Sequence, residues 1–527
     1  MAKPIIRIHP AIGIARVGNS QKIFVGPEIP GLHPLIKEYR DEQGKLKRQA
    51  ARFRLFLDDG GAPREITLKD VKEITWTVHL RNTKAAAPRC SGVLRTRSTL
   101  RNARVKDRKV LVLDPGTRTI CGANGEVEAV CNRFMGRPFP KPLKLYTLRT
   151  DSEGRLLIVG GHGKAGSLTG AGLTEHHGND FANHDGWYDD TSDGSVEALV
   201  TLKNNSRIRA RPSWVIVAPP KYAPALQSIT TLYDTLYQVA IDQKRAPNPF
   251  QRSGKGSFRP SFRNDVYPIL RRAGELRWVF SKMAVAHEHQ FPVTQARKNP
   301  AYRAHVFRQF RKPSGFVKKP GSGVGSMPYI WSDLFPYPTN GSVTKHQYNI
   351  LQAWAEGRFD DDWKIKPTIS KVCSPEGLDR AALEACVGAA FYPGIECSFH
   401  MRDKFRYEEL FRLDHVSLVP GDVTAQMSIP WQSDFVDCSD GDEPFVWWPA
   451  QRPIDVMLLN QKENYPTARW ARGFSGNKQD LGAMGMVRQW HRLGLISQVK
   501  GRFVETQRVE DMSANGKHKG ISLRPKC

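Results

Sequence analysis

Apolar and polar residues alternate along much of the first 235 residues, with the period of two that is typical of β-strands. Stretches rich in Val, Ile and Thr are separated by Gly, Asp and Asn. The last of them, SWVIVAPP, is continuously apolar before two prolines, as in a buried strand that ends there. We predict strands in IIRIHPAIGIARV (5–17), REITL (64–68), EITWTVHL (73–80), KVLVLDPG (109–116), RLLIVGG (155–161), SVEALVTL (195–202) and SWVIVAPP (213–220).

Helical periodicity appears only after these strands. The patterns predict helices within 226–240, 265–279, 344–356, 379–387 and 483–493. Thr344 and Gln347 form a capping box, and Gly357 fits the stop of that helix. In the last helix Trp490 shares one face with Met486, Val487 and Leu493, which more often indicates a core residue than a functional one.

This order of elements predicts an α+β fold. We expect a mostly-β N-terminal domain (1–240), a helical and loop-rich connecting region (241–341), and an α+β C-terminal domain (342–527). The segments 244–264 and 312–341 are rich in Pro, Gly and Arg and favour linkers or long loops.

Composition indicates a globular protein. Of 527 residues 40% are hydrophobic, and no apolar run is long enough for a membrane-spanning helix. The N-terminus lacks the apolar core of a Sec signal, so we expect a cytoplasmic protein, with later release from the cell left open. Eight cysteines without a CxxC pair argue against a zinc ribbon or a disulfide scaffold.

The net charge of +27 is concentrated in two segments. Segment 81–109 holds ten Lys and Arg with one acid, and segment 297–319 holds eight with none. Such segments could bind nucleic acid or an anionic surface. Because neither matches a nucleic-acid module, we favour solvated loops.

Three short stretches could carry chemistry. Segment 173–200 gathers His176, His177 and His184 with six acids ahead of a strand: Glu175, Asp180, Asp185, Asp189, Asp190 and Asp193. Its spacing fits no helix-borne metal pair, so a self-bonded loop without metal is the preferred interpretation. In 386–405, Glu396 and His400 would project from one side of a strand and could act as an acid–base pair, although a structural hydrogen bond is commoner. In 430–453, five acids and three tryptophans surround Cys438, which alone indicates a loop beside a core.

Several longer motifs occur in order over most of the chain: HPAIGIARVGNS (9–20), DDTSDGSVEALV (189–200), SWVIVAPPKYAPA (213–225), DVYPILRRA (265–273), LDRAALEACVGAAFYPGIE (378–396), IPWQSDFVDC (429–438), WWPAQRP (447–453) and MVRQWHRLG (486–494). Together they resemble the cysteine tryptophylquinone amine oxidases typified by bacterial L-lysine ε-oxidase and glycine oxidase.

The resemblance implies a protein-derived quinone, in which a tryptophan is joined by a thioether to a cysteine. By motif position these are Trp490 and Cys438, although Trp447, Trp448 and Trp470 are also near in sequence. Asp434, four residues before the cysteine, would serve cofactor formation and base chemistry. We expect the active site to be lined by Cys386, Phe391, Tyr392, Glu396 and His400.

The implied reaction is oxidative deamination of a primary amine or amino acid with O₂, giving an aldehyde or oxo-acid, ammonia and H₂O₂. The resemblance also implies a separate FAD-dependent modifying enzyme and a homo-oligomer. The sequence GAAFYPGIE departs from the family pattern and leaves the substrate open, a peptide included. Two alternatives are a member with an unformed quinone or another redox role such as peroxide breakdown, and a basic protein that binds nucleic acid or an anionic surface.

Overall fold

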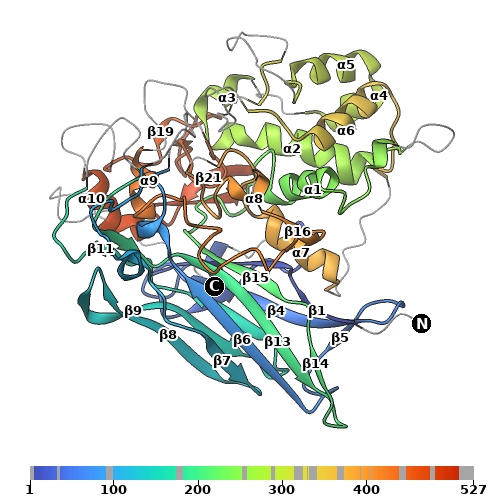
Figure 1. The fold of residues 1–527 in the computed structure, drawn as a ribbon. Helices are drawn as coiled ribbons and strands as arrows, with labels where there is room; N and C mark the ends of the chain where they lie inside the picture. The colour runs from blue at the N-terminus through green and yellow to red at the C-terminus, as the bar shows by residue number, and fades with distance from the viewer. Residues whose placement is uncertain are drawn as a thin grey trace.

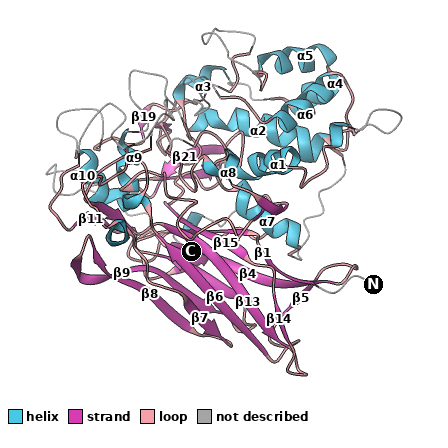
Figure 2. Ribbon diagram, in the orientation of Figure 1, coloured by secondary structure: helices cyan, strands magenta, loops and turns pink. Residues whose placement is uncertain are grey.

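The structure is a computed structural model, and it describes residues 5–32, 36–90, 99–173, 182–251, 258–286, 291–313, 325–328, 330, 341–364, 373–391, 393–403, 405–437, 447–474 and 481–509. A large sheet forms one side of the molecule, and helices cover the other (Figures 1 and 2).

Thirteen strands build this sheet, and all lie in the first 218 residues. Their bounds are β1 (Ile5–His9), β2 (Ile12–Arg16), β3 (Ile23–Val25), β4 (Arg48–Asp58), β5 (Arg64–Ile66), β6 (Glu73–Arg81), β7 (Arg118–Cys121), β8 (Glu126–Phe134), β9 (Arg137–Thr150), β10 (Leu156–Gly160), β13 (Ser192–Thr201), β14 (Arg207–Arg209) and β15 (Ser213–Ala218). A separate hairpin-like pair is formed by β11 (Ala165–Ser167) and β12 (Trp187–Asp189).

The main path of the sheet runs β7-β6-β13-β15-β2-β4-β10-β9-β8. β15 pairs with β2 in parallel, and β3 with β4, whereas the other pairs are antiparallel. Every residue of β2 and of β15 is buried, as expected for central strands covered on both faces. β6 instead alternates buried and half-exposed residues, the pattern of a strand with one solvated face.

The prediction of a strand at KVLVLDPG (109–116) is wrong. Residues Arg108–Leu111 form a 3₁₀ helix, which begins where the Asp107 carboxylate accepts the main-chain N–H of Lys109. This local hydrogen bond turns the chain before an extended strand can form. The other predicted strands are present within a few residues of their predicted bounds.

Ten α-helices follow the sheet in the described part of the chain. They are α1 (Leu232–Asp242), α2 (Tyr267–Glu275), α3 (Ser281–Ala286), α4 (Val293–Lys298), α5 (Pro300–Gln309), α6 (Lys345–Ala355), α7 (Pro375–Glu384), α8 (His400–Asp403), α9 (Trp431–Asp437) and α10 (Gly482–Gln489). Short strand pairs complete the C-terminal part: β16 (Tyr407–Glu409) with β17 (Arg412–Leu413), β18 (Asp455–Val456) with β19 (Ala468–Arg469), and β20 (Leu495–Val499) with β21 (Arg502–Thr506).

Capping explains where the helices differ from prediction. The capping box predicted at Thr344 and Gln347 is confirmed. α1 begins later than expected, because Thr231 caps it in a second capping box. α7 begins earlier and ends earlier than the predicted 379–387, since Ser374 caps it and Pro375 occupies its first turn. α10 ends at Gln489, and Trp490 begins a 3₁₀ turn (Trp490–Arg492).

One hydrophobic cluster joins the first strand to the last, from Ile6 to Val504. A buried pair also joins β1 to α7, since Nδ1 of His9 and Oδ1 of Asp379 lie 3.1 Å apart. The predicted α+β class is confirmed, and the proposed domain boundaries stay a prediction. None of the helices in the described ranges is long and apolar enough to cross a bilayer.

The described residues of the basic segments confirm the expectation of solvated segments only in part, because six of their Lys and Arg residues are exposed and four are buried. Lys84 and Arg101 are completely buried, and Arg303 and Arg311 nearly so. Arg101 donates to the main-chain carbonyls of Lys84, Ala182, Ala425 and Met427. The Arg101 guanidinium group therefore cross-links loops in the interior.

Candidate active site

Trp490 lies in the interior, with 3% of its surface exposed. Its indole N–H donates to the main-chain carbonyl of Gly163 at 3.2 Å. Its ring meets the ring of Trp431 edge-on, with centroids 5.2 Å apart and planes at 69°. A buried indole held by a hydrogen bond on one side and an aromatic edge on another has a fixed orientation.

Gly163 approaches Trp490 so closely that no side chain fits between them. A Cβ at this position would lie 2.1 Å from Cζ2 of Trp490, and the φ of 69° is itself suited to glycine. The same carbonyl accepts a second hydrogen bond, at 3.0 Å, from the side-chain amide of Gln432 in α9. One main-chain oxygen that follows β10 thus joins α9 to Trp490.

The main chain at and after Trp490 is also held by side chains from the N-terminal part. The Tyr222 hydroxyl donates to the Trp490 carbonyl at 2.6 Å. The Arg40 guanidinium donates to the carbonyls of His491 and Leu493, each at 2.9 Å. Both anchors come from outside the C-terminal part, so Trp490 is positioned by the sheet side of the molecule.

The first turn of α9 rests on a buried ion pair. Lys84 and Asp189 lie 2.5 Å apart, and neither side chain has any exposed surface. The same Asp189 oxygen, Oδ2, also accepts the main-chain N–H of Trp431, the first residue of α9, at 3.0 Å. Burial lowers the pKa of Lys84, while Asp189 acts in the opposite direction. A carboxylate at a helix N-terminus satisfies its free N–H groups.

Arg452 holds the last turn of α9. Its guanidinium donates twice to the Phe435 carbonyl, at 3.0 and 2.8 Å, and once to the Val436 carbonyl at 3.3 Å. A cation on these carbonyls satisfies the C-terminal end of the helix. The last residue of α9 is Asp437, and Cys438, which comes next, lies outside the described residues. The predicted link between Cys438 and Trp490 therefore stays a prediction.

Asp434 lies in the middle of α9, with 1% of its surface exposed. It shares this helix with Trp431, whose ring contacts Trp490, and with Phe435, whose ring lies 6.2 Å from that of Trp470. α9 thus contacts two of the candidate tryptophans. Trp448 is directed elsewhere, since its indole N–H donates to the Ala390 carbonyl at 2.8 Å.

Asp190 is a second buried carboxyl group beside Gly163. Oδ2 of Asp190 lies so near the main chain that a Cβ on Gly161 would come within 2.3 Å of it. Neither Asp190 oxygen makes a well-aligned hydrogen bond to a described residue. Burial raises the pKa of Asp190 to about 7, although the nearby main-chain N–H groups of Lys164 and Gly163 favour the charged form. Buried groups with such pKa values are frequent at functional sites.

The predicted pairing of Glu396 with His400 on a strand is wrong. No strand occurs among the described residues between 386 and 405, and His400 begins α8. Glu396 instead binds Arg16 at 2.7 Å, and its other oxygen accepts the Val387 N–H at 3.2 Å. His400 packs against Phe399, with ring centroids 4.3 Å apart. The Glu396 carboxylate and the His400 imidazole thus contact different residues.

The remaining predicted lining residues lie in a second hydrophobic cluster. Cys386 and Phe391 belong to it, whereas Trp490 belongs to the first. Arg16 also approaches the Cys386 sulfur at 3.7 Å, and burial raises the pKa of that thiol far above its usual range. Tyr392 lies outside the described residues. Lining of the active site by this segment stays a prediction.

Asp189 and Asp193, two of the acids of segment 173–200, have structural partners. The Thr191 N–H binds Asp189 at 3.2 Å, as a self-bonded loop predicts, but Asp193 reaches further and accepts the Trp214 indole N–H at 2.9 Å. His176 and His177 lie outside the described residues. Within the described ranges no group of three or more His, Cys, Asp or Glu side chains could hold a metal ion.

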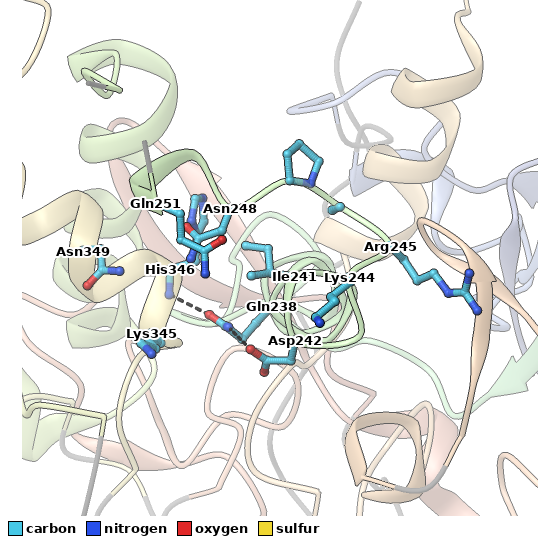
Figure 3. Close-up of a pocket in the computed structure, with 12 residues that line it drawn as sticks. Gln238, Ile241, Asp242, Lys244, Arg245, Asn248, Gln251, Lys345, His346 and Asn349 are labelled. Atoms are coloured by element: carbon cyan, nitrogen blue, oxygen red, sulfur yellow. Dashed lines mark hydrogen bonds between the residues drawn. The ribbon is translucent and has the colours of Figure 1, made fainter. Parts of the chain in front are cut away.

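One cavity is lined by residues other than these. It has a volume of about 630 Å³ and lies between the end of α1 and the start of α6, where Gln238 contacts Asp242 and the main chain of His346 (Figure 3). None of its lining residues contributes to the Trp490 site. Its wall is polar, and we base the functional assignment on the buried chemistry around Trp490 instead.

Sequence reasoning missed several residues of this site, chiefly Gly163, Lys84, Asp189, Tyr222 and Arg452. Two signals were available. The glycine-rich GGHG (160–163) at the end of a predicted strand often marks a close backbone approach, and Lys84 is an isolated lysine in an otherwise apolar turn.

Comparisons with known proteins agree with the sequence motifs. Residues 9–217 match the family model described as L-lysine epsilon oxidase N-terminal, and residues 337–461 match that of the L-lysine epsilon oxidase C-terminal domain. The L-lysine 6-oxidase of Marinomonas mediterranea is 28% identical over 536 residues, which cover 82% of this chain and 71% of that protein.

Solved structures share the fold over nearly the whole length. The epsilon-lysine oxidase of M. mediterranea superposes with a TM-score of 0.77 at 24% identity, covering 95% of each chain. A crystal structure of the Schiff base intermediate of that organism's L-Lys epsilon-oxidase with L-Lys gives a TM-score of 0.75 at 25% identity, again with 95% of each chain covered. The motifs, both family models and the shared fold agree, and the chain belongs to the L-lysine ε-oxidase family.

Proposed function

We propose that this protein oxidises the amino group of an amino acid with O₂, releasing ammonia and H₂O₂, through a quinone formed from Trp490 and linked to Cys438. The observation that carries the proposal is the buried indole of Trp490, packed on the helix whose next residue is Cys438. Family membership supports an oxidoreductase that acts on an amino acid. The relative crystallised with L-Lys suggests a basic amino acid as the first substrate to test.

The described residues fit such a cofactor. Trp490 is buried and held in one orientation, and α9 is fixed at its first turn by Asp189 and at its last turn by Arg452. Joining an indole carbon to a cysteine sulfur needs both partners to stay within bonding reach, which two rigid anchors favour. When formed, a tryptophylquinone supplies an electrophilic carbonyl carbon and accepts two electrons from the amine.

The chain's own residues orient the indole, shield it from water and move protons. The Gly163 carbonyl fixes the tilt of the indole, and Trp431 covers one side of it. Burial of both rings excludes water from the reacting centre. Asp434, buried on α9, is the group we assign to remove the proton from the substrate carbon, because a carboxylate shielded from water is a stronger base.

Intact mass and peptide mapping test the cofactor. The protein is purified from cells that also express a FAD-dependent modifying enzyme, and we expect a cross-linked peptide pair containing Cys438 and Trp490, a mass change for added oxygen, and quinone staining after denaturation. Trp490→Phe should lose all three signals, whereas Trp470→Phe should keep the staining. An unmodified mass in the wild-type protein would refute the proposal, and a link to Trp470 would refute the assignment of Trp490.

An amino-acid screen for H₂O₂ release tests the reaction itself. We expect H₂O₂ release with at least one amino acid, together with a stoichiometric amount of ammonia. Asp434→Asn should lose this activity, whether its cofactor forms fully or in reduced yield. A formed cofactor that releases no H₂O₂ with any amino acid or amine would favour another redox role. Size-exclusion chromatography with light scattering tests the expected homo-oligomer.

A further inference from the structure

Trp431, the first residue of α9, is a buried tryptophan whose indole N–H has no partner. Its side chain is 2% exposed, and Nε1 makes no hydrogen bond to any residue that the structure describes. Leaving such a donor unpaired in the interior is costly, so it calls for a physical explanation. By contrast, the indole N–H donates to an oxygen in most buried tryptophans of the described ranges: Trp76, Trp187, Trp214, Trp354, Trp448, Trp470 and Trp490.

The ring of Trp431 lies against the ring of Trp490. Their centroids are 5.2 Å apart and their planes meet at 69°. The contact is set by two helices that lie side by side, α9 and α10, since Trp490 directly follows α10 (Figure 1). The second ring against Trp431 is that of Phe435, at 5.2 Å, and it consists of carbon alone. The unpaired N–H is therefore carried by a ring that touches Trp490 and is otherwise packed on an apolar side chain.

The indole of Trp490 offers no oxygen to this donor before it is oxidised. Its only polar group is its own N–H, which already donates to the Gly163 carbonyl at 3.2 Å. The proposed cofactor differs, because an ortho-quinone carries two carbonyl oxygens on the ring, and carbonyl oxygens accept hydrogen bonds. Oxidation of Trp490 would thus create an acceptor beside a buried donor that lacks one.

Other polar side chains near this ring are already committed or can reach water. The Gln432 amide donates to the Gly163 carbonyl at 3.0 Å. A charged Asp434 carboxylate can only accept hydrogen bonds. The His491 ring, 5.7 Å from that of Trp490, is only half-buried. Trp431 is thus a buried and uncommitted donor in direct contact with the ring of Trp490.

We propose that Trp431 is a further residue of the active site, whose indole N–H donates a hydrogen bond to an oxygen that Trp490 gains on oxidation. This bond fixes the orientation of the quinone and draws electron density from its carbonyl group. The carbonyl carbon then becomes more electrophilic toward an amine. The inference rests on the proposed cofactor and assigns a residue that orients and polarises it.

Indole ¹⁵N–¹H spectra of tryptophan-labelled protein test the hydrogen bond directly. Without the modifying enzyme, the Trp431 indole proton should resonate upfield, as an unbonded group, and it should move downfield once the cofactor has formed. Trp431→Phe identifies this signal. The Trp470 N–H, which donates to the Gly494 carbonyl at 2.9 Å, should keep its position in both forms. A Trp431 signal at the bonded position in the unmodified protein would mean that water is its partner and would overturn the inference.

The carbonyl stretch of the quinone gives a second readout. Replacing Trp431 by 3-benzothienylalanine keeps the shape of the ring but exchanges the N–H for sulfur, so the resonance Raman frequency of one carbonyl should rise. Trp278→Phe is the matched control, because Nε1 of Trp278 is also buried without a partner, but its ring packs against Phe503 at 6.2 Å. This control should leave the frequency unchanged. An unchanged frequency in the benzothienyl variant would contradict the proposed bond.

Mass spectrometry separates this inference from the proposed function. A quinone on Trp490 with a shifted Trp431 signal, in a protein that oxidises no amino acid, would refute the proposed reaction and support the hydrogen bond. A quinone on Trp490 with an unmoved Trp431 signal would overturn the inference alone. The absence of added oxygen on Trp490 would overturn both.

Discussion

The carbonyl oxygen of Gly163 accepts the indole N–H of Trp490 at 3.2 Å, across 327 positions of sequence. Gly163→Ala would place a methyl group 2.1 Å from the indole Cζ2. We expect a destabilisation of about 1–3 kcal/mol from overpacking, and a lower yield of the cross-linked product. Differential scanning fluorimetry and intact mass measure the two effects.

Gly170→Ala is the matched control for that change. Gly170 has a similar φ of 76°, but nothing lies within 4 Å of its added Cβ. It should therefore cost only the backbone strain, roughly 1 kcal/mol, and leave the cross-link intact. Equal losses in the two variants would mean that contact with Trp490 does not matter.

The buried ion pair of Lys84 and Asp189 predicts strong coupling between the two residues. Lys84→Met leaves a buried, unpaired carboxylate at the start of α9 and should cost about 3–5 kcal/mol. Lys84→Met combined with Asp189→Asn should be more stable than Lys84→Met alone, since no charge then remains buried. Urea unfolding of the wild type, the two single variants and the double variant gives the coupling energy between Lys84 and Asp189. Strictly additive effects on the free energy of unfolding would contradict the prediction.

Asp190 predicts a pH dependence of stability. Its pKa is 3.8 in an ordinary carboxyl group and is raised to about 7 in the folded protein. The folded state therefore holds its proton more tightly than the unfolded state, so stability falls as pH rises from about 4 to about 7 and stays lower above that range. Asp190→Asn cannot ionise and should gain stability relative to wild type at pH 8, by at most roughly 4 kcal/mol, but not at pH 4.

Melting temperatures of both proteins across pH 4–8 measure this difference. A difference between Asp190→Asn and wild type that does not change with pH would show that Asp190 ionises normally.

Arg452 predicts an effect on cofactor formation at a distance from the reacting atoms. Arg452→Lys keeps the charge but loses the planar fork that binds two carbonyls, so the last turn of α9 should loosen. We expect a lower fraction of cross-linked protein with a modest loss of thermal stability. Full cross-linking in this variant would show that the anchor at the last turn is dispensable.

Local patterns predicted the parts of the fold whose residues are neighbours in sequence. The alternation in β6 and the apolar run in β15 identified two strands, and the Thr344 capping box located α6, because periodicity and capping act over a few residues. The same reasoning failed for Arg108–Leu111, where one Asp107 hydrogen bond outweighed an apolar run.

The site was only partly predictable for the same reason. The motifs singled out Trp490 and Asp434, and the structure places the first against the helix of the second. The residues that hold them are distant in sequence: Lys84 lies 105 positions from Asp189, and Tyr222 lies 268 from Trp490. The periodicity of the sequence gives no sign of such contacts, since only folding brings these distant residues together.

The anchoring of α9 and of Trp490 has a consequence for how this protein can be divided. Both lie in the last hundred residues, yet Asp189 aligns the first and Gly163 the second. Contacts with the N-terminal part therefore hold α9 and Trp490 in place. If the proposed cofactor forms, a fragment that begins after the sheet would contain both of its residues, Cys438 and Trp490, but would lack the contacts that position them.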